Sequence, residues 1–229
     1  MRVILGGLQK STLQDYPDKI ACIIFTKGCN FKCGYCHNPE LFDSKSPTIE
    51  LSEILDFLKT RVNKLDGVVI TGGEPTLHQD LPKFIKEIKN LGFCVKLDTN
   101  GTNYTMLKTL INEKLIDYVA MDIKSPIEKY NKITNSKVDI NEVKKSIELL
   151  KSDVIDYEFR TTIVKSQLNI DDFKIIAQEI KGAKKYFLQK FEPSKTLDKN
   201  FMQEKSYNDD ELKPFIELLK KEIEYVEIR

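Results

Sequence analysis

Three cysteines stand close together in the first quarter of the chain. Cys29, Cys33 and Cys36 have the spacing C-x3-C-x-Φ-C, in which Φ is the aromatic residue Tyr35. Thiolates this near to one another predict a metal centre. A four-iron cluster normally takes four cysteine ligands, so a loop that supplies three leaves one iron open to a substrate or cofactor. The spacing therefore predicts an iron–sulfur centre that takes part in chemistry.

A structural zinc ion and a disulfide framework are the alternative interpretations. Zinc takes four protein ligands, and the nearby fourth candidate is His37, which is too close to Cys36 for an easy tetrahedral site. Disulfide frameworks are typical of short secreted chains, whereas this chain has 229 residues and an odd count of five cysteines. We expect no signal peptide in residues 1–10. The remaining two cysteines, Cys22 and Cys94, are expected to be core residues.

Polar motifs follow several of the strand-like segments. The turn Gly72-Gly73-Glu74-Pro75 exposes backbone groups that can bind an extended polar ligand such as an amino acid. Asp98 and Asp122 each end a strand, and two neighbouring carboxylates favour a cation, a ribose or an ammonium group between them; capping of the next segment is the alternative. Lys124 and Arg160 could receive a carboxylate. An unpaired buried guanidinium is costly, so we expect Arg160 to have a partner.

Strand-like and helix-like segments alternate along the chain, which predicts an α/β fold with a parallel sheet covered by helices. Sites in such sheets lie at the carboxyl ends of the strands, so the motifs above are expected to converge on one rim. The expected strands are 20–26, 67–71, 93–99, 118–123, 155–164, 184–191 and 225–228, and the expected helices are 51–65, 81–91, 104–113, 141–151, 171–181 and 209–221. Residues 129–139 are expected to form a long loop.

Composition limits the functional classes. The chain has 36 Lys and Arg against 35 Asp and Glu, a net charge of +1, so charge does not indicate nucleic acid or a membrane as a partner. The longest apolar run, residues 20–26, is far shorter than a membrane span. We expect one cytoplasmic domain over residues 1–229, in which residues 1–19 form an N-terminal extension that packs on the barrel.

The motifs together resemble those of radical S-adenosylmethionine (SAM) enzymes. The cysteine run followed by Gly72-Gly73-Glu74-Pro75 carries this resemblance, which covers most of the chain. Cys36-His37-Asn38, residues 97–101 and residues 121–124 are similar to pyruvate formate-lyase activases. Residues 7–17 and 25–31 resemble the activating proteins of anaerobic ribonucleoside-triphosphate reductases. The implied fold is a partial (β/α)6 TIM-like barrel of the radical SAM type.

The resemblance implies a role for each motif of the cysteine loop and the glycine turn. Cys29, Cys33 and Cys36 would ligate a [4Fe-4S] cluster whose fourth iron chelates the amino and carboxylate groups of SAM. The backbone of Gly72, Gly73 and Glu74 would bind the methionyl amino group. Tyr35 and the main chain at His37 would contact the adenine, and Cys36 would also count among the cofactor-binding residues.

The resemblance also assigns the charged strand ends. Asp98, Thr99 and Asp122 match positions around a monovalent cation beside SAM, and Lys124 and Arg160 would meet the SAM carboxylate. A reduced cluster would cleave SAM, and the resulting 5′-deoxyadenosyl radical would abstract hydrogen from a glycine of a partner protein. The expected partner is anaerobic ribonucleotide reductase, with an external electron donor such as flavodoxin because the chain has no second cysteine cluster.

Two departures from the family pattern bear on the partner. The Asp-Gly-Pro-Gly-x-Arg signature of many glycyl-radical activases appears only as residues 15–20, Asp-Tyr-Pro-Asp-Lys-Ile, and Glu192 stands near where formate-lyase activases place a histidine. A pyruvate formate-lyase-type activase stays an alternative. So do a small-molecule enzyme of the 7-carboxy-7-deazaguanine synthase type and, outside enzymes, an iron–sulfur or zinc-binding module.

Overall fold

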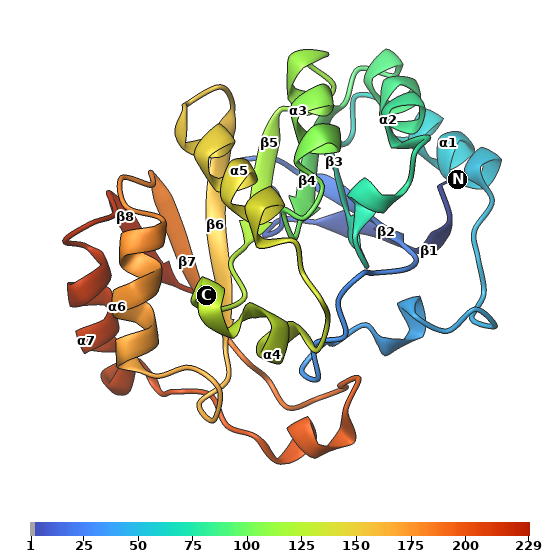
Figure 1. Cartoon of the computed structure of the whole chain (residues 1–229). Helices are drawn as coiled ribbons and strands as arrows, with labels where there is room; N and C mark the ends of the chain where they lie inside the picture. The colour runs from blue at the N-terminus through green and yellow to red at the C-terminus, as the bar shows by residue number, and fades with distance from the viewer. Residues whose placement is uncertain (1–2) are drawn as a thin grey trace. The chain divides into compact units, whose positions relative to one another are not determined.

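The computed structural model describes residues 3–229 (Figure 1). The strands are β1 (Leu5–Thr12), β2 (Ala21–Thr26), β3 (Gly67–Gly72), β4 (Cys94–Thr99), β5 (Tyr118–Asp122), β6 (Asp156–Ile163), β7 (Lys185–Lys190) and β8 (Tyr225–Ile228). The α-helices are α1 (Leu51–Lys59), α2 (Leu81–Asn90), α3 (Tyr104–Asn112), α4 (Tyr130–Thr134), α5 (Ile140–Lys151), α6 (Ile170–Glu179) and α7 (Asp209–Leu219). Short 3-10 helices are η1 (Pro39–Leu41), η2 (Pro75–Leu77), η3 (Ile127–Lys129) and η4 (Lys199–Gln203).

The α/β class predicted from the sequence is confirmed. The strands are hydrogen-bonded in the order of the sequence, from β1 to β8. Parallel pairing joins β2 to β3, β3 to β4, β6 to β7 and β7 to β8. Helices follow the strands from β2 to β7, and these repeated strand–helix pairs are the ones that the hydrophobic pattern predicted. The seven predicted strands and six predicted helices all form, although the helix predicted at 51–65 ends at Lys59.

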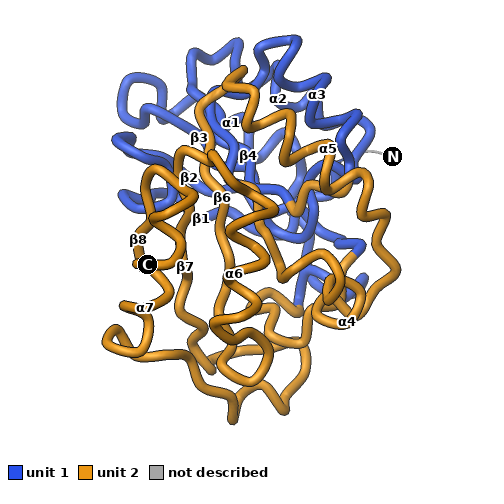
Figure 2. Tube along the Cα trace, turned by 60° about the vertical axis from the view of Figure 1, so that its left-hand side comes forward, with its two compact units in different colours: residues 1–30, 40–99, 103–120 blue, residues 31–39, 100–102, 121–229 orange. Residues whose placement is uncertain are grey.

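The chain divides into two compact units, which Figure 2 shows in separate colours. Unit 1 contains residues 1–30, 40–99 and 103–120, and unit 2 contains residues 31–39, 100–102 and 121–229. The division falls inside the cysteine loop, so that Cys29 belongs to unit 1 while Cys33 and Cys36 belong to unit 2. The prediction of one domain over the whole chain stays a prediction.

Unit 1 contains a strand that the sequence analysis missed. β1 pairs antiparallel with β2, with register shifts at two places. The alternating pattern of β1 is weak because only its first and last residues are buried. Residues 1–19 were expected to form an extension, and the described part of that segment contributes β1 and Tyr16. Residues 1–2 lie outside the described part of the chain.

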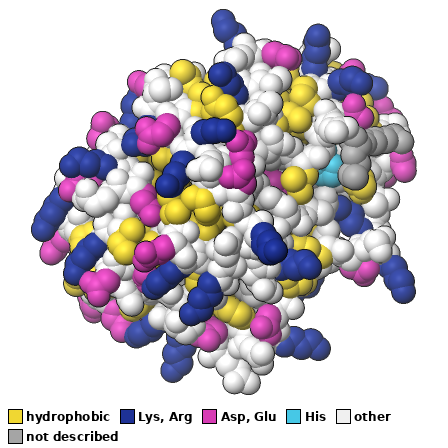
Figure 3. Space-filling view, in the orientation of Figure 1, with side chains coloured by type: hydrophobic (Ala, Val, Ile, Leu, Met, Phe, Trp, Pro, Cys, Tyr) yellow, Lys and Arg dark blue, Asp and Glu magenta, His cyan; other side chains and the backbone are white. Residues whose placement is uncertain are grey.

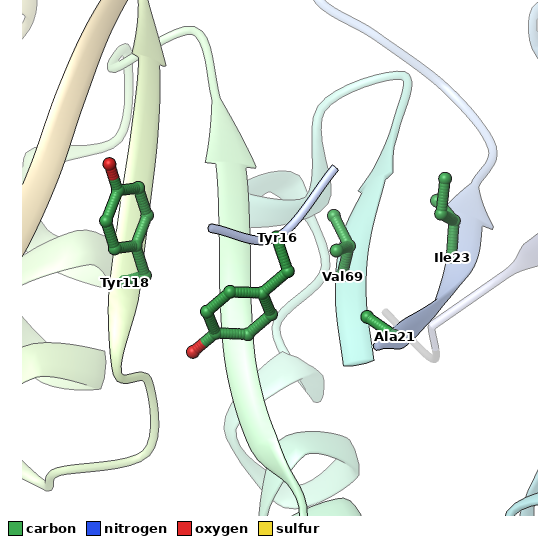
Figure 4. Packing of buried hydrophobic residues seen from close by; sticks show 5 residues of the cluster. All are labelled: Tyr16, Ala21, Ile23, Val69 and Tyr118. Atoms are coloured by element: carbon green, nitrogen blue, oxygen red, sulfur yellow. The ribbon is translucent and has the colours of Figure 1, made fainter. Parts of the chain in front are cut away.

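The core of unit 1 lies against the sheet. One cluster of buried residues is shown in Figure 4 and comprises Tyr16, Ala21, Ile23, Val69 and Tyr118. Cys22 is fully buried, and burial raises the pKa of its thiol to about 12, so it stays a neutral core side chain. Cys94 is partly buried and packs on the cluster. Both cysteines therefore lie in or against the core, as predicted.

Unit 2 contains the last three strands and the helices α4 to α7. Side chains of α6 and α7 pack together, with the rings of Phe173 and Phe215 edge to face at 5.2 Å. Asn169 and Asn208 cap these two helices, each in a capping box. The prediction that residues 129–139 form a long loop was wrong, because Tyr130–Thr134 form α4, whose Tyr130 and Ile133 are buried. Two apolar side chains were too short a pattern to indicate a helix.

The surface and the helices give no sign of a membrane segment in the described residues. On the face drawn in Figure 3, Lys and Arg side chains are interspersed with Asp and Glu. Among residues 3–229, each helix falls short of the length or the apolar character that crossing a membrane requires.

Candidate functional site

Hydrogen bonds within unit 1 fix the start of the cysteine loop. The N–H of Gly28 donates to the carbonyl of Leu41 at 2.9 Å. The buried His78 approaches the carbonyl of Lys27 with Nε2 at 3.0 Å, so its ring packs against the backbone that leads into the loop. Gly28 has φ of +86°, a conformation that glycine adopts at little cost. The chain therefore enters the loop at Cys29 with a defined direction.

The glycine turn that follows β3 lies directly against this entry. The N–H of Gly73 donates to Thr26 O at 2.9 Å, and the N–H of Glu74 donates to Gly28 O at 2.8 Å. A Cβ atom on Gly73 would lie 1.9 Å from Gly28 O, and Gly72 has φ of +115°. Both positions therefore require glycine. Because an ammonium group only donates hydrogen bonds, a bound ammonium would have to be met by carbonyl oxygens of the turn.

The side chain of Glu74 braces the turn from inside. It is fully buried, and its Oε1 accepts hydrogen bonds from Thr76 N at 3.0 Å, Thr76 Oγ1 at 2.6 Å and Thr99 Oγ1 at 2.8 Å. A buried carboxylate is stable when it accepts several such bonds. Glu74 therefore holds η2 and the end of β4 to the glycine turn, and the Thr99 hydroxyl donates its proton to Glu74.

Asp98 carries a cationic partner from its own strand. Lys96 Nζ lies 2.6 Å from Asp98 Oδ1, and the Lys96 side chain is 2% exposed. The two residues are two positions apart, so they lie on the same face of β4. The sequence analysis missed Lys96, although a lysine two residues before an aspartate in a buried strand is a signal that could have identified it.

The second half of the cysteine loop is held within unit 2. Leu197 N donates to Cys36 O at 3.0 Å, and Asp198 N donates to Gly34 O at 3.0 Å. A Cβ atom on Gly34 would lie 2.3 Å from the ring of Phe201. The segment between β7 and α7, residues 191–208, thus binds the loop through its backbone. No motif in this segment predicted the contact.

The aromatic side chains of the loop are also engaged in unit 2. The Tyr35 ring is buried and lies 6.2 Å from the Phe201 ring. The His37 ring stacks on Phe191 at 5.3 Å, and its Nε2 lies 2.9 Å from Glu192 O. The His37 side chain is therefore occupied by packing. The Glu192 side chain, near the position where formate-lyase activases have a histidine, is exposed.

Asp122, Lys124 and Arg160 form an ionic group at the ends of β5 and β6. Asp122 Oδ2 lies 2.9 Å from Lys124 Nζ, and Asp122 Oδ1 lies 3.1 Å from Arg160 Nε. Burial by itself would raise the pKa of Asp122, but the ammonium and the guanidinium outweigh burial and lower it to about 2. The expectation that Arg160 has a partner is confirmed. Asp98 belongs to unit 1 and Asp122 to unit 2, so their convergence stays a prediction.

The donor set fits an iron–sulfur cluster. Cys29, Cys33 and Cys36 are free thiols, and burial raises the pKa of Cys33 while the nearby Lys124 ammonium opposes that rise. The buried Tyr35 hydroxyl, which lies beside the Cys33 thiol, has no hydrogen-bond partner within residues 3–229; a thiolate ligand is an acceptor that it could use. In the same residues, no group of three or more His, Cys, Asp or Glu side chains gathers as a site for a metal ion. A cluster takes each thiolate on a separate iron.

The charges around Asp98 and Asp122 do not call for an additional monovalent cation. Lys96 already neutralises Asp98, and Lys124 with Arg160 already neutralises Asp122. These side chains supply at least one positive charge for each carboxylate. The monovalent cation that the family resemblance implied is therefore not required by the charges in either unit.

Comparisons with known proteins agree with the motifs. The family model described as Radical SAM superfamily matches residues 23–180. A proposed glycyl-radical enzyme activating enzyme of Methanocaldococcus jannaschii is 36% identical over 100% of this chain and 97% of its own length.

Solved structures show the fold. SuiB of Streptococcus suis bound to S-adenosylmethionine has a TM-score of 0.67 at 13% identity, over 88% of this chain and 48% of that protein. A domain of pyruvate-formate lyase-activating enzyme from Bacteroides vulgatus has a TM-score of 0.58 at 15% identity, over 71% of this chain and 98% of that domain. The chain thus spans about half the length of SuiB. These likenesses confirm the predicted partial TIM-like barrel.

We expect Gly73→Ala to displace Cys29. The added methyl group would meet Gly28 O at 1.9 Å, so the backbone at residues 28–29 must shift, at a cost of about 1–3 kcal/mol. Iron bound per chain after anaerobic reconstitution should fall. The control is Gly92→Ala, where a Cβ has no neighbour within 4 Å and the cost is backbone strain at φ of +90°, about 1–2 kcal/mol. Wild-type iron binding by Gly73→Ala would contradict the expectation.

We expect the Asp122 ion group to stabilise the fold in a pH-dependent way. The folded pKa of Asp122 is about 2 against an ordinary value of 3.8, so its contribution of about 2 kcal/mol is present above pH 3.8 and is lost as the pH falls toward 2. Asp122→Asn should lower the free energy of unfolding at pH 7, and its difference from wild type should shrink between pH 4 and pH 2. Urea denaturation at each pH measures this.

The matched control is Asp56→Asn, which removes an exposed ion pair with Lys59. Such pairs contribute less than about 1 kcal/mol. A difference between Asp122→Asn and wild type that stays constant from pH 7 to pH 2 would show that the Asp122 charge is not what stabilises the fold.

Proposed function

The chain belongs to the Radical SAM superfamily, and from this premise we propose that it is an activating enzyme that generates a glycyl radical on a partner protein. The observation that carries the proposal is the full-length similarity to the activating enzyme relative of Methanocaldococcus jannaschii. The motifs quoted above, Cys36-His37-Asn38 and residues 97–101, support it from the sequence. Family membership by itself shows that the chain is a radical SAM enzyme, and the glycyl-radical partner is the proposed step beyond it.

We propose that Cys29, Cys33 and Cys36 ligate a [4Fe-4S] cluster and that SAM binds beside it. When bound, the cluster supplies one electron for SAM cleavage, which yields the 5′-deoxyadenosyl radical that removes a hydrogen atom from the partner's glycine. The chain's own residues hold the reactants. In unit 1 the hydrogen bonds at Gly28 fix the backbone next to Cys29, and in unit 2 those at Gly34 and Cys36 fix the backbone around Cys33 and Cys36.

The glycine turn is proposed to take the methionyl amino group through its carbonyl oxygens. This assignment follows from the chemistry of the group, because an ammonium donates hydrogen bonds and therefore needs acceptors. Lys124 and Arg160 are proposed to attract the SAM carboxylate. Their shared partner Asp122 leaves the group with one net positive charge, which is of the correct sign for a carboxylate.

We infer that the protein substrate is anaerobic ribonucleotide reductase and that the reaction takes place in the cytoplasm. Residues 7–17 and 25–31 support this partner, because they resemble the activating proteins of those reductases. Residues 7–12 belong to β1, which pairs with β2 directly before the cysteine loop. Electrons come from an external one-electron donor such as flavodoxin.

The cysteine roles can be tested one residue at a time. Replacing Cys29, Cys33 or Cys36 by alanine should abolish four-iron content after anaerobic reconstitution and reduce SAM cleavage by at least about 1,000-fold, because a missing thiolate leaves an iron without its ligand. The measurements are iron analysis and the yield of 5′-deoxyadenosine. Cys94→Ala is the control and should retain both properties. A cysteine-to-alanine variant of the loop that still held four irons and cleaved SAM would contradict the assignment of that cysteine as a ligand.

Hydrogen transfer tests the substrate class. The reduced enzyme, SAM and a glycyl-radical protein with deuterated glycine Cα should give deuterium in 5′-deoxyadenosine and a glycyl signal in electron paramagnetic resonance. An otherwise identical partner with its radical glycine replaced by alanine is the control and should give neither. Transfer of deuterium to 5′-deoxyadenosine from a labelled purine or pterin metabolite, with no transfer from anaerobic ribonucleotide reductase or pyruvate formate-lyase, would refute the activase function. The assignment as a radical SAM enzyme would remain.

A further inference from the structure

Lys96 is the most deeply buried ammonium group among the described ion pairs. Its side chain is 2% exposed, and its flanking residues Val95 and Leu97 are fully buried. Lysines are almost never fully buried without a partner, since removal of an ammonium group from water is costly. The partner here is Asp98, at 2.6 Å.

Stability alone is a poor explanation for this pair. Buried ion pairs lose in desolvation much of what they gain in attraction, and apolar replacements are often as stable. Surface pairs such as Lys59 with Asp56, whose side chains are 62% and 72% exposed, carry no comparable desolvation cost. A lysine in the middle of β4 is therefore explained better by a need for positive charge at Asp98 than by packing.

Each of the two carboxylates near the end of β4 has its own compensation within the chain. Thr99 donates a hydrogen bond to the buried carboxylate of Glu74. Asp98, one position earlier, points to the other face of β4, and its side chain is only 14% exposed, so its charge needs a separate partner. Glu74 is stabilised by its three hydrogen bonds, and Asp98 is stabilised by Lys96.

Asp122 is the second carboxylate that the family resemblance assigns to a monovalent cation, and side chains of the protein neutralise it as well. Asp122, in unit 2, has both Lys124 and Arg160 as partners. In each unit the positive charge comes from a side chain of the chain itself. A monovalent cation would add a further charge where the carboxylate has already been neutralised.

We propose that Lys96 is a built-in counterion that replaces a bound monovalent cation at Asp98, so that the enzyme needs neither K⁺ nor Na⁺ at this position. The ammonium carries the same charge as such an ion and is fixed by the backbone of β4. The assignment of Asp98 to the SAM site belongs to the proposed function, but Lys96 and its pairing are tested without SAM, a reductant or a partner protein.

The test compares the reconstituted wild type with Lys96→Met in KCl, NaCl and tetramethylammonium chloride at equal ionic strength. Wild type should have the same unfolding midpoint in all three salts. Lys96→Met removes the ammonium but keeps an unbranched apolar chain as far as Cε, and it leaves Asp98 able to recruit an ion. The unfolding midpoint of Lys96→Met should be higher in KCl or NaCl than in tetramethylammonium chloride by about 4 °C or more, and the increase should saturate with the concentration of the cation. In ²³Na nuclear magnetic resonance, added Lys96→Met should broaden the sodium line, and added K⁺ should reverse the broadening by competing for the site. Wild type and the other variants should not broaden the line.

Two control variants separate charge from general salt effects. Lys59→Met, in the exposed pair, should show no difference between the salts, and Lys96→Arg, which keeps a positive charge, should behave as wild type. A saturable, cation-selective shift or ²³Na broadening in wild type would overturn the proposal, as would a folded Lys96→Met that responds to K⁺ and Na⁺ no more than wild type does. If Lys96→Met does not fold, the wild-type measurements decide.

Discussion

Charges that leave water must meet opposite charges or several hydrogen bonds, and this constraint governs the groups around the strand ends. Glu74 accepts three hydrogen bonds, Asp98 pairs with Lys96, and Asp122 pairs with Lys124 and Arg160. Each carboxylate thus has fixed partners within the protein. For Asp122 the two cations hold the pKa at about 2, so its carboxylate is ionised at neutral pH.

The cysteine loop depends on a second constraint, the close approach of backbones. Gly73 lies against Gly28 on one side of the loop, and Gly34 lies against Phe201 on the other. Side chains larger than hydrogen at Gly73 or Gly34 would separate these contacts. Within unit 1 the first residues of the loop are hydrogen-bonded to the glycine turn, and within unit 2 its second half is hydrogen-bonded to residues 191–208.

Family membership and partner choice rest on different observations. Membership in the Radical SAM superfamily follows from a match that covers residues 23–180, which include the cysteine loop and the glycine turn. The proposed partner rests instead on the resemblance of residues 7–17, which lie outside the matched range, to one group of activating proteins. A common core that makes the radical is compatible with many substrates, since fold alone does not fix function.

The sequence by itself determined the chemistry and most of the fold. The cysteine spacing and the glycine turn are local in sequence, and the periods of apolar residues gave the strands β2 to β8 and six helices. Arg160 could be expected to have a partner because burial of a charge has a known cost. β1 was not predicted because few of its residues are buried, which leaves little alternation of apolar and polar residues. α4 was not predicted because it has only five residues.

Only the tertiary structure decided which groups neutralise one another. Lys96 and Asp98 lie two residues apart, but their ion pair depends on the burial of that face of β4. The contacts of Phe201 with Gly34 and of Leu197 with Cys36 join segments about 160 residues apart. Sequence patterns report the periodicity of a single segment, whereas such contacts depend on how distant segments pack, and packing is set by the sum of many weak interactions.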